Sequence, residues 1–534
     1  MCAAVRRAPA MAEAIITDPP AGTPRNASLT DWIAVAAGSL GTLLATLDVS
    51  ITNSALPQIQ GQIGATGTEG TWIATGYLMS EIVMIPLAAW LTRVFGLRRF
   101  LIGTALMFTF FSLFCGLSSS LGAMIAGRIG QGFAGGAMIP TAQTIVRTRL
   151  PAHQLAIGTT LFGMTAILGP LMGPVVGGWL TENINWRWCF FLNLPISVAL
   201  ITLLLTGLAA ERMNLERFIK ADWLGIIGLA MGLSSLTVVL EEGQREHWFD
   251  SLLIIWLSIA MLIGFFLIAL GQVRSSTPIL RLQLVLNSSF GSVLLIATAV
   301  GAGLYGTAYL VPQFLGILSG YNAEQSGSIM LLSGIPAFLL MPILPKMLGR
   351  IDLRLMVGVG LLLYWASCLL DTELTAQSVG HDFVASQLLR GVAQILVMMP
   401  LSQLSMRAVQ TQDAGDASGL YNMSRNLGGT LGLALLGVLM DRRSHFHDDV
   451  LREGILANSQ LAQDHMASNT ARYLAQTGDP STAQLQALGQ LANDIAQQAS
   501  VLAYNDAFHV LGLAMLACLP LIFILKTRAA QAGS

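Results

Sequence analysis

Residues 252–271 read LLIIWLSIAMLIGFFLIALG, a run of twenty residues without a single charge. A helix of about 20 apolar residues is long enough to cross a hydrocarbon core of roughly 30 Å. This length and uniform apolarity predict a helix that spans a membrane.

Windows of the same kind recur along the whole chain, separated by short polar breaks. We count fourteen, at 32–55, 71–91, 99–118, 121–146, 157–180, 188–208, 222–240, 252–271, 289–315, 326–346, 353–371, 383–406, 419–440 and 503–525. The composition agrees, because 54% of the 534 residues are hydrophobic and only 11% are charged, against roughly 25% charged residues in soluble domains. We therefore expect an all-α polytopic membrane protein.

Charge and residue usage exclude several classes of function. The 28 basic and 29 acidic residues nearly cancel, so no basic field points to nucleic acid. The five cysteines are scattered without a CxxC pair. None of the three lysines, Lys220, Lys346 and Lys526, follows a glycine as in a phosphate-binding loop. We expect a protein that is not an enzyme and that uses neither a cofactor nor a metal.

The distribution of arginine and lysine predicts the orientation, because cytoplasmic segments carry the excess. With the N-terminus inside, 19 of the 28 basic residues lie in cytoplasmic segments, six in outer loops and three within spans. Both termini are then cytoplasmic, in agreement with an even number of spans. The tail at 1–31 lacks the apolar core of a cleavable signal peptide.

One outer segment, 441–502, is much longer than the others. It holds four arginines and seven acidic residues, and Leu485, Leu488, Leu491 and Ile495 follow a helical spacing that predicts one or two amphipathic surface helices. The alternative is a metal site built from His445, His447, Asp448 and Asp449. We favour a solvated loop, because nothing in the sequence supplies a defined ligand geometry.

Ionisable residues within the spans are the first functional candidates, because burying a charge in a membrane is expensive. Away from the span ends the sequence has Asp48, Glu81, Arg128 and Arg390. At 1.5 Å per residue, Asp48 and Arg128 both lie roughly 10 Å below the outer ends of their spans. Equal depth allows a buried ion pair. The pair is either a static lock between two helices or a proton-coupling site whose carboxylate gains and loses a proton.

Glu81 lies roughly 14 Å into the second span, near the midplane of the membrane. Two interpretations stay open for this residue as well. It is either a neutral acid that is hydrogen-bonded at a helix contact, or a group that takes up and releases protons during transport.

The fifth span, 157–180, is rich in glycine and proline. In 157–180, a spacing of four places Gly169, Gly173 and Gly177 on one helix face, where another backbone can approach closely. Pro170 and Pro174 bend this helix and remove hydrogen-bond donors, and Gly178 follows the last of the three glycines. We expect these six residues at an interface on which two helix bundles rock.

A weak internal repeat predicts the two bundles. Arg390 is followed by Pro400 much as Arg128 is followed by Pro140, at an offset of eight helices. Two six-helix units at 32–210 and 276–528, with an inserted pair of helices at 211–275, explain this offset, and parallel repeats are common in transporters. Short tails at 1–31 and 529–534 complete the division.

Several motifs resemble one family. Residues 47–57, LDVSITNSALP, resemble the first-helix motif LDxTIVNVALP of the fourteen-helix drug:proton antiporters of the major facilitator superfamily, the EmrB/QacA type. Residues 127–132 resemble motif B of that family, 169–178 resemble its antiporter motif C, and WRWCFFLNLP at 186–195 resembles its entry to the sixth helix. The resemblance runs from about Asp31 to Arg528.

The loop between the second and third spans departs from the family pattern. The superfamily motif GxLaDRxGRR appears here at 89–99 as AWLTRVFGLRR, so that Arg93 occupies the acidic position. Gly96, Arg98 and Arg99 remain as the cytoplasmic gate loop. A gate that depends on the missing aspartate cannot operate unchanged.

The resemblance implies a major facilitator fold and proton-coupled efflux of amphipathic or hydrophobic drugs across the bacterial inner membrane. It also implies Asp48 and Arg128 as coupling residues, and a tripartite system with a periplasmic adaptor protein and an outer-membrane channel. Glu81 is added from its depth. The alternative is a facilitator-fold exporter or symporter that is specific for one metabolite or fatty acid.

Overall fold

The computed structural model describes residues 26–275, 278–454 and 460–525, and within these ranges the chain is helical without any strand. The first group of helices is α1 Leu29–Ile63, α2 Gly67–Gly70, α3 Trp72–Phe95, α4 Leu97–Leu117, α5 Leu121–Gly135, α6 Met138–Arg149, α7 Leu155–Asn183, α8 Arg187–Phe191 and α9 Asn193–Gly207. A middle group follows, with α10 Leu215–Ile219, α11 Trp223–Glu242, η1 Trp248–Asp250, α12 Leu252–Arg274 and η2 Leu282–Leu284.

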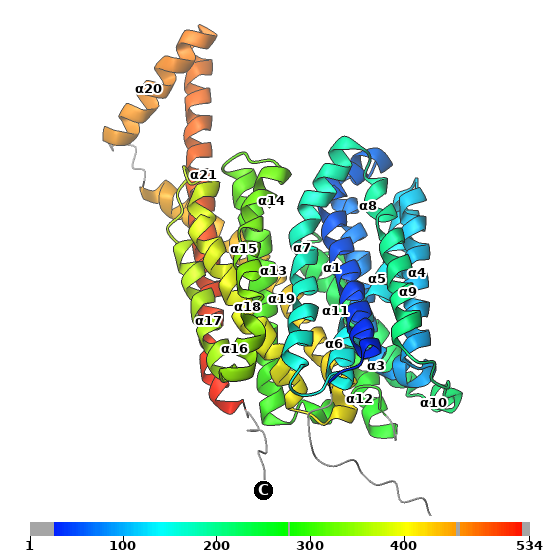
Figure 1. Ribbon diagram of the computed structural model, residues 1–534. Coiled ribbons are helices and arrows are strands. Elements are labelled where there is room, and N and C mark those ends of the chain that lie inside the picture. Colours follow the sequence, from blue (N-terminus) through cyan, green and yellow to red (C-terminus); the bar gives the residue numbers. More distant parts are fainter. Residues whose placement is uncertain (1–25, 276–277, 455–459, 526–534) are drawn as a thin grey trace, which may run out of the picture.

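The last group begins with a long helix and ends at Ile524. Its members are α13 Ser288–Ile317, α14 Ala323–Leu331, α15 Gly334–Leu340, α16 Leu344–Arg350, α17 Leu353–Leu370, η3 Gly380–Phe383, α18 Val384–Arg407, η4 Thr411–Asp413, α19 Ala414–Gly454, α20 Gln460–Thr477, α21 Pro480–Ala517 and η5 Leu519–Ile524. Figure 1 shows these helices standing side by side.

All fourteen predicted windows are helical over most of their length. Eleven helices of the described ranges are long and apolar enough to cross a membrane, or twelve if the pair bent by 64° at α14–α16 counts as one span. Two of the fourteen predicted windows are therefore not counted among these spans. The window at 121–146 is divided between α5 and α6 at Gly136, and α19 carries Arg425 between two asparagines.

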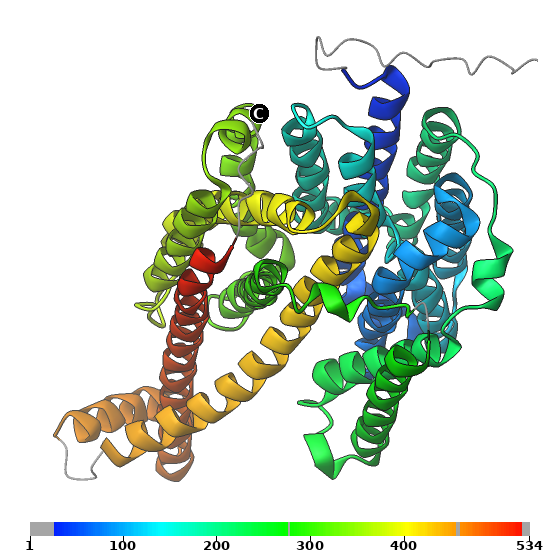
Figure 2. The same cartoon turned by 90° about the horizontal axis from the view of Figure 1, so that it is seen from below.

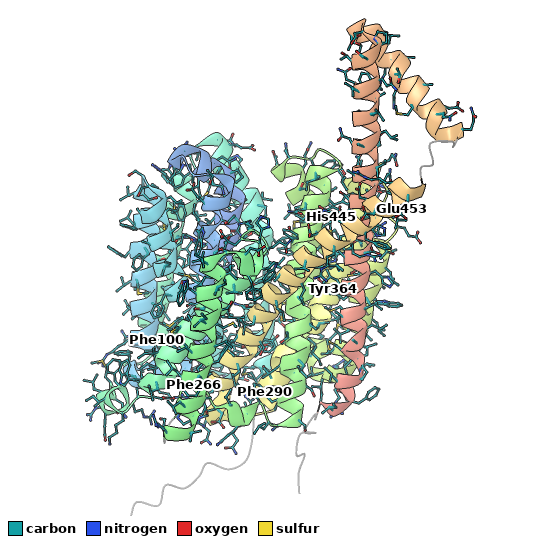
Figure 3. All side chains as sticks on the ribbon, turned by 180° about the vertical axis from the view of Figure 1, so that it is seen from behind. Phe100, Phe266, Phe290, Tyr364, His445 and Glu453 are labelled. Atoms are coloured by element: carbon teal, nitrogen blue, oxygen red, sulfur yellow. The ribbon has the colours of Figure 1, made fainter. Side chains whose placement is uncertain are left out.

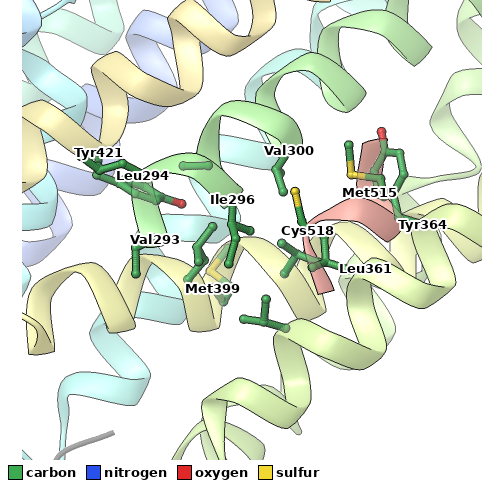
Figure 4. Close-up of a cluster of buried hydrophobic side chains, with 14 of the residues drawn as sticks. Val293, Leu294, Ile296, Val300, Leu361, Tyr364, Met399, Tyr421, Met515 and Cys518 are labelled. Atoms are coloured by element: carbon green, nitrogen blue, oxygen red, sulfur yellow. The ribbon is translucent and has the colours of Figure 1, made fainter. Parts of the chain in front are cut away.

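Two groups of helices are visible when the molecule is seen from below (Figure 2). Buried residues of α1, α4, α6 and α9 form one apolar core, while a larger core joins α13, α17, α18 and α21. Part of α3 belongs to the larger core, through residues 82–88. Figure 4 shows side chains of the larger core, including Val300, Leu361 and Met399.

The two inserted helices form a tight pair. Gly232 of α11 and Gly264 of α12 meet backbone to backbone, and the Ser234 hydroxyl of α11 donates to the Met79 carbonyl oxygen of α3 at 3.0 Å. The outer surface of α12 exposes large apolar side chains, with Trp256 67% and Phe266 65% exposed. Figure 3 shows the position of Phe266. Such a surface fits a helix that faces lipid.

The start of α1 and the end of η5 lie at the same end of the molecule, the lower end in Figure 1. The segment around α20 projects from the opposite end. An even number of crossings places the two ends of a chain on one side of the membrane, so this arrangement agrees with the predicted topology.

The described part of 441–502 is helical as predicted, with α20 as a separate helix, but the ends predicted for the two adjoining spans are wrong. Helix α19 continues beyond residue 440 to Gly454, and α21 begins at Pro480, far before the predicted start at 503. No glycine or proline interrupts 441–453, and Asp479 caps α21 through the Thr482 amide at 2.9 Å. Both spans therefore run out of the membrane as continuous helices.

We call residues 441–454, α20 and 480–502 the arm. Its helices pack through small side chains, because Ala483 and Ala487 of α21 are fully buried, whereas Leu485 and Leu488 are 70% and 49% exposed. The predicted helical spacing is confirmed, and Leu491 and Ile495 are half-buried, but Leu485 and Leu488 point away from the hairpin. Alanine, with the shorter side chain, allows the closer approach of two helices.

An ion-pair cluster braces the base of the arm. Asp506 of α21 accepts from the Arg443 Nε at 2.6 Å and contacts the His447 Nε2 at 2.7 Å. Figure 3 shows His445 and Glu453 on the same segment of α19. No group of three or more His, Cys, Asp or Glu residues within the described ranges is arranged to hold a metal ion.

Candidate proton-coupling and substrate site

Asp48 is the centre of a buried polar cluster. The Arg128 Nη1 donates to the Asp48 Oδ2 at 2.5 Å, and both side chains are fully buried. The Asp48 Oδ1 accepts from Gln131 at 3.0 Å and from Asn193 at 2.6 Å. Asp48 therefore receives hydrogen bonds from α5 and α9, and the predicted ion pair between the first and fourth spans is present.

Neighbouring groups fix the direction of Arg128. Its guanidinium lies over the Tyr77 ring, 4.4 Å from the centroid, and its Nη1 also donates to Gln131 at 3.0 Å. Asn193 is held in turn by Ser112 of α4 at 2.9 Å. Helices α1, α4, α5 and α9 thus share one hydrogen-bond network, and Tyr77 of α3 packs against it. Protonation or replacement of Asp48 would disturb hydrogen bonds in this whole network.

Sequence analysis did not assign roles to Gln131 and Asn193. Both lie inside motifs that point to the family, but only ionisable residues were weighed as candidates. Uncharged amides within the spans were the signal that could have found them, because a buried amide needs a hydrogen-bonding partner.

Glu81 lies at the contact between the two helix groups. Its carboxylate belongs to α3 and is buried, and the two arginines that act on it electrostatically are Arg425 of α19 and Arg128 of α5. Its backbone is covered closely by Gly136, where a Cβ atom would lie 2.6 Å from the Glu81 carbonyl oxygen. The structure therefore brings Arg425, which the sequence places nearer a span end, to the central acid.

A second acidic site was missed because it lies at the end of a span. Glu242 of α11 is buried and accepts from the Thr75 hydroxyl of α3 at 2.6 Å, and Arg245 lies 3.5 Å from its carboxylate. This contact attaches the inserted pair of helices to α3.

The six residues of the predicted bundle interface differ in what they contact. A Cβ atom at Gly169, Gly173 or Gly177 would collide with hydroxyl groups of α1, so this glycine face packs within the first group of helices. The Ser50 hydroxyl donates to the Pro170 carbonyl oxygen at 3.0 Å. Pro174 meets the second group, with its Cβ 3.2 Å from a Cβ built at Gly327 of α14. No described residue lies within 4 Å of a Cβ at Gly178.

The gate loop joins α3 to α4 with an unusual backbone. Gly96 has a φ of 79°, which favours glycine, and the Leu97 amide donates to Glu211 at 3.2 Å. Arg98 is half-buried and Arg99 is exposed.

Arg93 finds an acidic partner in the other group of helices. Its two terminal nitrogens donate to the two carboxylate oxygens of Asp416, at the start of α19, at 2.9 and 3.0 Å. Arg281 pairs with Asp413 and, at 3.4 Å, with Asp416. Arg93 stands where motif A has an aspartate. Its positive charge is balanced by Asp416 of the other helix group, and the two residues form an ion pair across the interface.

Hydrogen bonds between amide and hydroxyl groups also join the two helix groups at the end of the molecule that carries Arg93. Gln143 of α6 donates to the Ser402 hydroxyl of α18, and its Oε1 accepts from Ser418 at 2.6 Å and from Asn422 at 3.0 Å. These bonds connect the two helix groups on the side that carries Arg93. Sequence analysis could not pair them, because they lie more than 250 positions apart.

An apolar pocket lies between the groups. It has an empty volume of about 360 Å³ and is formed by α7 with α15, α16 and α18. Its lining is Thr160, Met164, Ile167, Leu168, Leu171, Ala337, Phe338, Met341, Leu344, Ile395 and Met399. Three methionines give such a surface the ability to adapt to different apolar shapes.

Comparison with known proteins decides the family. The model of the Major Facilitator Superfamily matches residues 38–433. The chain belongs to this superfamily. Within the superfamily it is similar to the EmrB type: it is 32% identical to the colistin resistance protein EmrB of Acinetobacter baumannii over 91% of the chain and 94% of that protein.

Two further relatives match over nearly their whole length. The multidrug export protein EmrB of Escherichia coli K12 is 30% identical over 91% of the chain and 94% of that protein. The fatty acid resistance protein FarB of Neisseria gonorrhoeae is 28% identical over 93% and 96%. A crystal structure of the human organic anion transporter MFSD10 (TETRAN) superposes with a TM-score of 0.61 at 15% identity, covering 95% of this chain and all of that one. This superfamily member is thus an all-α, multi-pass membrane protein of the EmrB type.

Proposed function

We propose that this chain exports hydrophobic and amphipathic drugs from the cytoplasm in exchange for protons. The observation that carries the proposal is the burial of Asp48 and Glu81, two carboxylates within apolar spans; Asp48 is paired with Arg128, and the charges of Arg425 and Arg128 act on Glu81 from a distance. Buried acids in membrane helices mark proton and substrate paths. The EmrB relatives, named for multidrug export and colistin resistance, support drugs as the substrates.

Each predicted residue then has a role. Asp48 and Arg128 couple proton binding to helix movement, and Glu81, at the contact between the groups, attracts cationic substrates. The six residues of α7 guide the movement of that helix, and Gly96, Arg98 and Arg99 shape the gate loop. The proton gradient supplies the energy, so the protein needs no cofactor and catalyses no chemical conversion.

The apolar pocket supports broad specificity. A surface of methionine, leucine, isoleucine and phenylalanine selects by apolarity and size, because it has no fixed hydrogen-bonding pattern to satisfy. Compounds of different shape can therefore use the same site.

One competing function has support from a relative. FarB is named for fatty acid resistance, and an apolar pocket also suits an acyl chain. A susceptibility panel on a deletion strain, with and without the gene, separates the two. We expect the gene to raise resistance to several chemically unrelated amphipathic drugs, whereas protection against fatty acids alone would favour the specific exporter.

We place the protein in the inner membrane of a two-membrane bacterium, with both termini in the cytoplasm and the arm in the periplasm. The positive charges on the side of Arg93 and the shared end of α1 and η5 support this orientation. The arm then points toward the outer membrane, where a periplasmic adaptor protein and an outer-membrane channel continue the export route.

We propose that the adaptor binds to the arm. It extends beyond the body of the molecule, and Leu485 and Leu488 are exposed in a segment that on this orientation faces water. Leu485 and Leu488 lie one helical turn apart, so that together they offer a partner an apolar contact. They lie opposite the alanine face that holds α20.

Replacing Leu485 and Leu488 by serine is expected to leave drug transport in proteoliposomes unchanged and to reduce resistance in a two-membrane host about tenfold or more, because loss of two apolar contacts weakens docking. Gln486→Ser with Asn493→Ser, on another exposed face of α21, is the matched control. Full resistance with the leucine variant would remove the docking surface.

A further inference from the structure

The second group of helices contains its own buried ion pair. The Arg390 Nη2 of α18 donates to the Asp371 Oδ2, at the end of α17, at 2.5 Å. The side chains are 2% and 0% exposed. Arg390 corresponds by the internal repeat to Arg128, so each helix group has one buried aspartate paired with one buried arginine.

The two aspartates differ in how their oxygens are used. Both oxygens of Asp48 accept hydrogen bonds, from three side chains in all. Asp371 uses only Oδ2, and its Oδ1 is buried without a hydrogen-bonding partner among the described residues. The Ser386 hydroxyl donates to the Phe383 carbonyl oxygen at 3.1 Å and also interacts with the Asp371 carboxylate. Asp371 therefore accepts fewer hydrogen bonds than Asp48, and a proton on its carboxylate displaces fewer of them.

Arg390 is also incompletely paired. Its Nε and Nη1 are buried without a partner in the part of the chain that the structure describes. A buried polar atom normally has a hydrogen-bonding partner, and in this pair three such atoms lack one within the described ranges. In the Asp48 cluster, Arg128 Nη2 and Asn193 Oδ1 lack one within the same ranges, but both oxygens of the aspartate are paired.

Within the described ranges, the surroundings contain no second charge that could replace Asp371. The titratable neighbours are Tyr364 and Cys368 of α17, and Tyr364 is held by the Thr307 hydroxyl of α13 at 3.1 Å. The other elements packed here present Gly303 from α13, Gly512 and Met515 from α21, Ser333 before α15, and the exposed His381 and Asp382 of η3. Figure 4 shows Met515 against Tyr364. When Asp371 is neutral, Arg390 keeps an uncompensated charge.

We propose that Asp371 carries a proton of its own during the transport cycle, so that each helix group holds one proton-linked aspartate–arginine pair. The proton adds to the carboxylate and converts it to a neutral acid; release of the same proton restores the ion pair. The unpaired Arg390 disfavours the packing of α17 on α18, and this links proton binding to movement. The inference rests on the proposed exchange of drugs for protons.

The test is the steady-state drug gradient in proteoliposomes of the full-length protein, with the membrane potential clamped at zero. A pH difference of one unit supports a drug ratio of about tenfold for each proton exchanged. Wild type is expected to reach about 100-fold if both pairs act. A wild type without any pH-driven gradient would refute the proposed function itself, before Asp371 is considered.

Asp371→Asn, and Asp371→Asn with Arg390→Gln, remove the proton site. The double variant also removes the stranded arginine, so that it tests coupling even if the single variant folds poorly. Glu373→Gln is the control, because Glu373 is an exposed acid two residues away. We expect a ratio about tenfold below wild type in the double variant and no change in the control. A wild-type ratio in the double variant, or a complete loss of coupling, overturns the inference.

Discussion

The Asp48→Asn variant is expected to lose proton-driven efflux almost completely. Asparagine cannot titrate and cannot balance Arg128, whose side chain is fully buried. Breaking a buried ion pair by removing one partner costs about 3–5 kcal/mol. The measurement is drug efflux from proteoliposomes under an imposed pH gradient, together with a thermal-unfolding curve that reports how much folded protein remains.

A second variant separates coupling from a static lock between helices. Asp48→Asn with Arg128→Gln removes both charges and leaves amides that can hydrogen-bond to Gln131 and Asn193. We expect folding to recover, while the drug ratio supported by one pH unit stays about tenfold below wild type, because one proton site is missing. If this neutral pair restores the wild-type ratio, the ion pair is structural only.

The Arg93→Glu variant is expected to open the side of the protein that the structure closes. The bidentate pair with Asp416 is replaced by repulsion from Asp413 and Asp416, and because Arg93 is partly exposed we take the whole pair to contribute about 1.5–3 kcal/mol. A change of this size shifts a two-state equilibrium about ten- to a hundredfold. The rate at which a thiol reagent modifies a cysteine at Thr159, a buried residue of the adjoining pocket between α6, α7 and α18, should rise accordingly.

Two further variants serve as an intermediate case and as a control for the labelling rate. Arg93→Gln loses the pair without adding repulsion and should fall between wild type and Arg93→Glu. Arg99→Glu changes the same charge in the same loop at an exposed position and should leave the labelling rate unchanged. Equal labelling in all four proteins would show that the ion pair does not hold this side closed.

Hydropathy and depth were enough to predict the helices and one ion pair. A run such as 252–271 has few alternatives to a membrane helix, and the equal depths of Asp48 and Arg128 follow from the rise of a helix alone. These are local properties, so one sequence contains them. The same reasoning located Glu81 but not its neighbours, because Arg425 comes to it from a helix 344 positions away.

Contacts between distant helices could not be predicted. Asp371 and Glu242 lie at the ends of apolar windows, where an acid is ordinarily solvated, and only the packing of α17 on α18 and of α11 on α3 buries them. The partner of Arg93 was hidden for the same reason. In the arm, helices were predicted from the spacing of Leu485, Leu488, Leu491 and Ile495, but the spans were ended at 440 and 503 because the composition becomes polar there; the absence of helix-breaking residues at 441–453 lets α19 continue.

The exchange of drug for protons is the central claim, and substrate-driven proton movement in proteoliposomes tests it most directly. A drug gradient is imposed with no initial pH difference and no membrane potential, and the lumenal pH is followed with wild type and Asp48→Asn. The account predicts that wild type moves protons in the direction opposite to the drug, and that Asp48→Asn gives almost no signal. Protons that move with the drug, or drug movement without any protons, would contradict it.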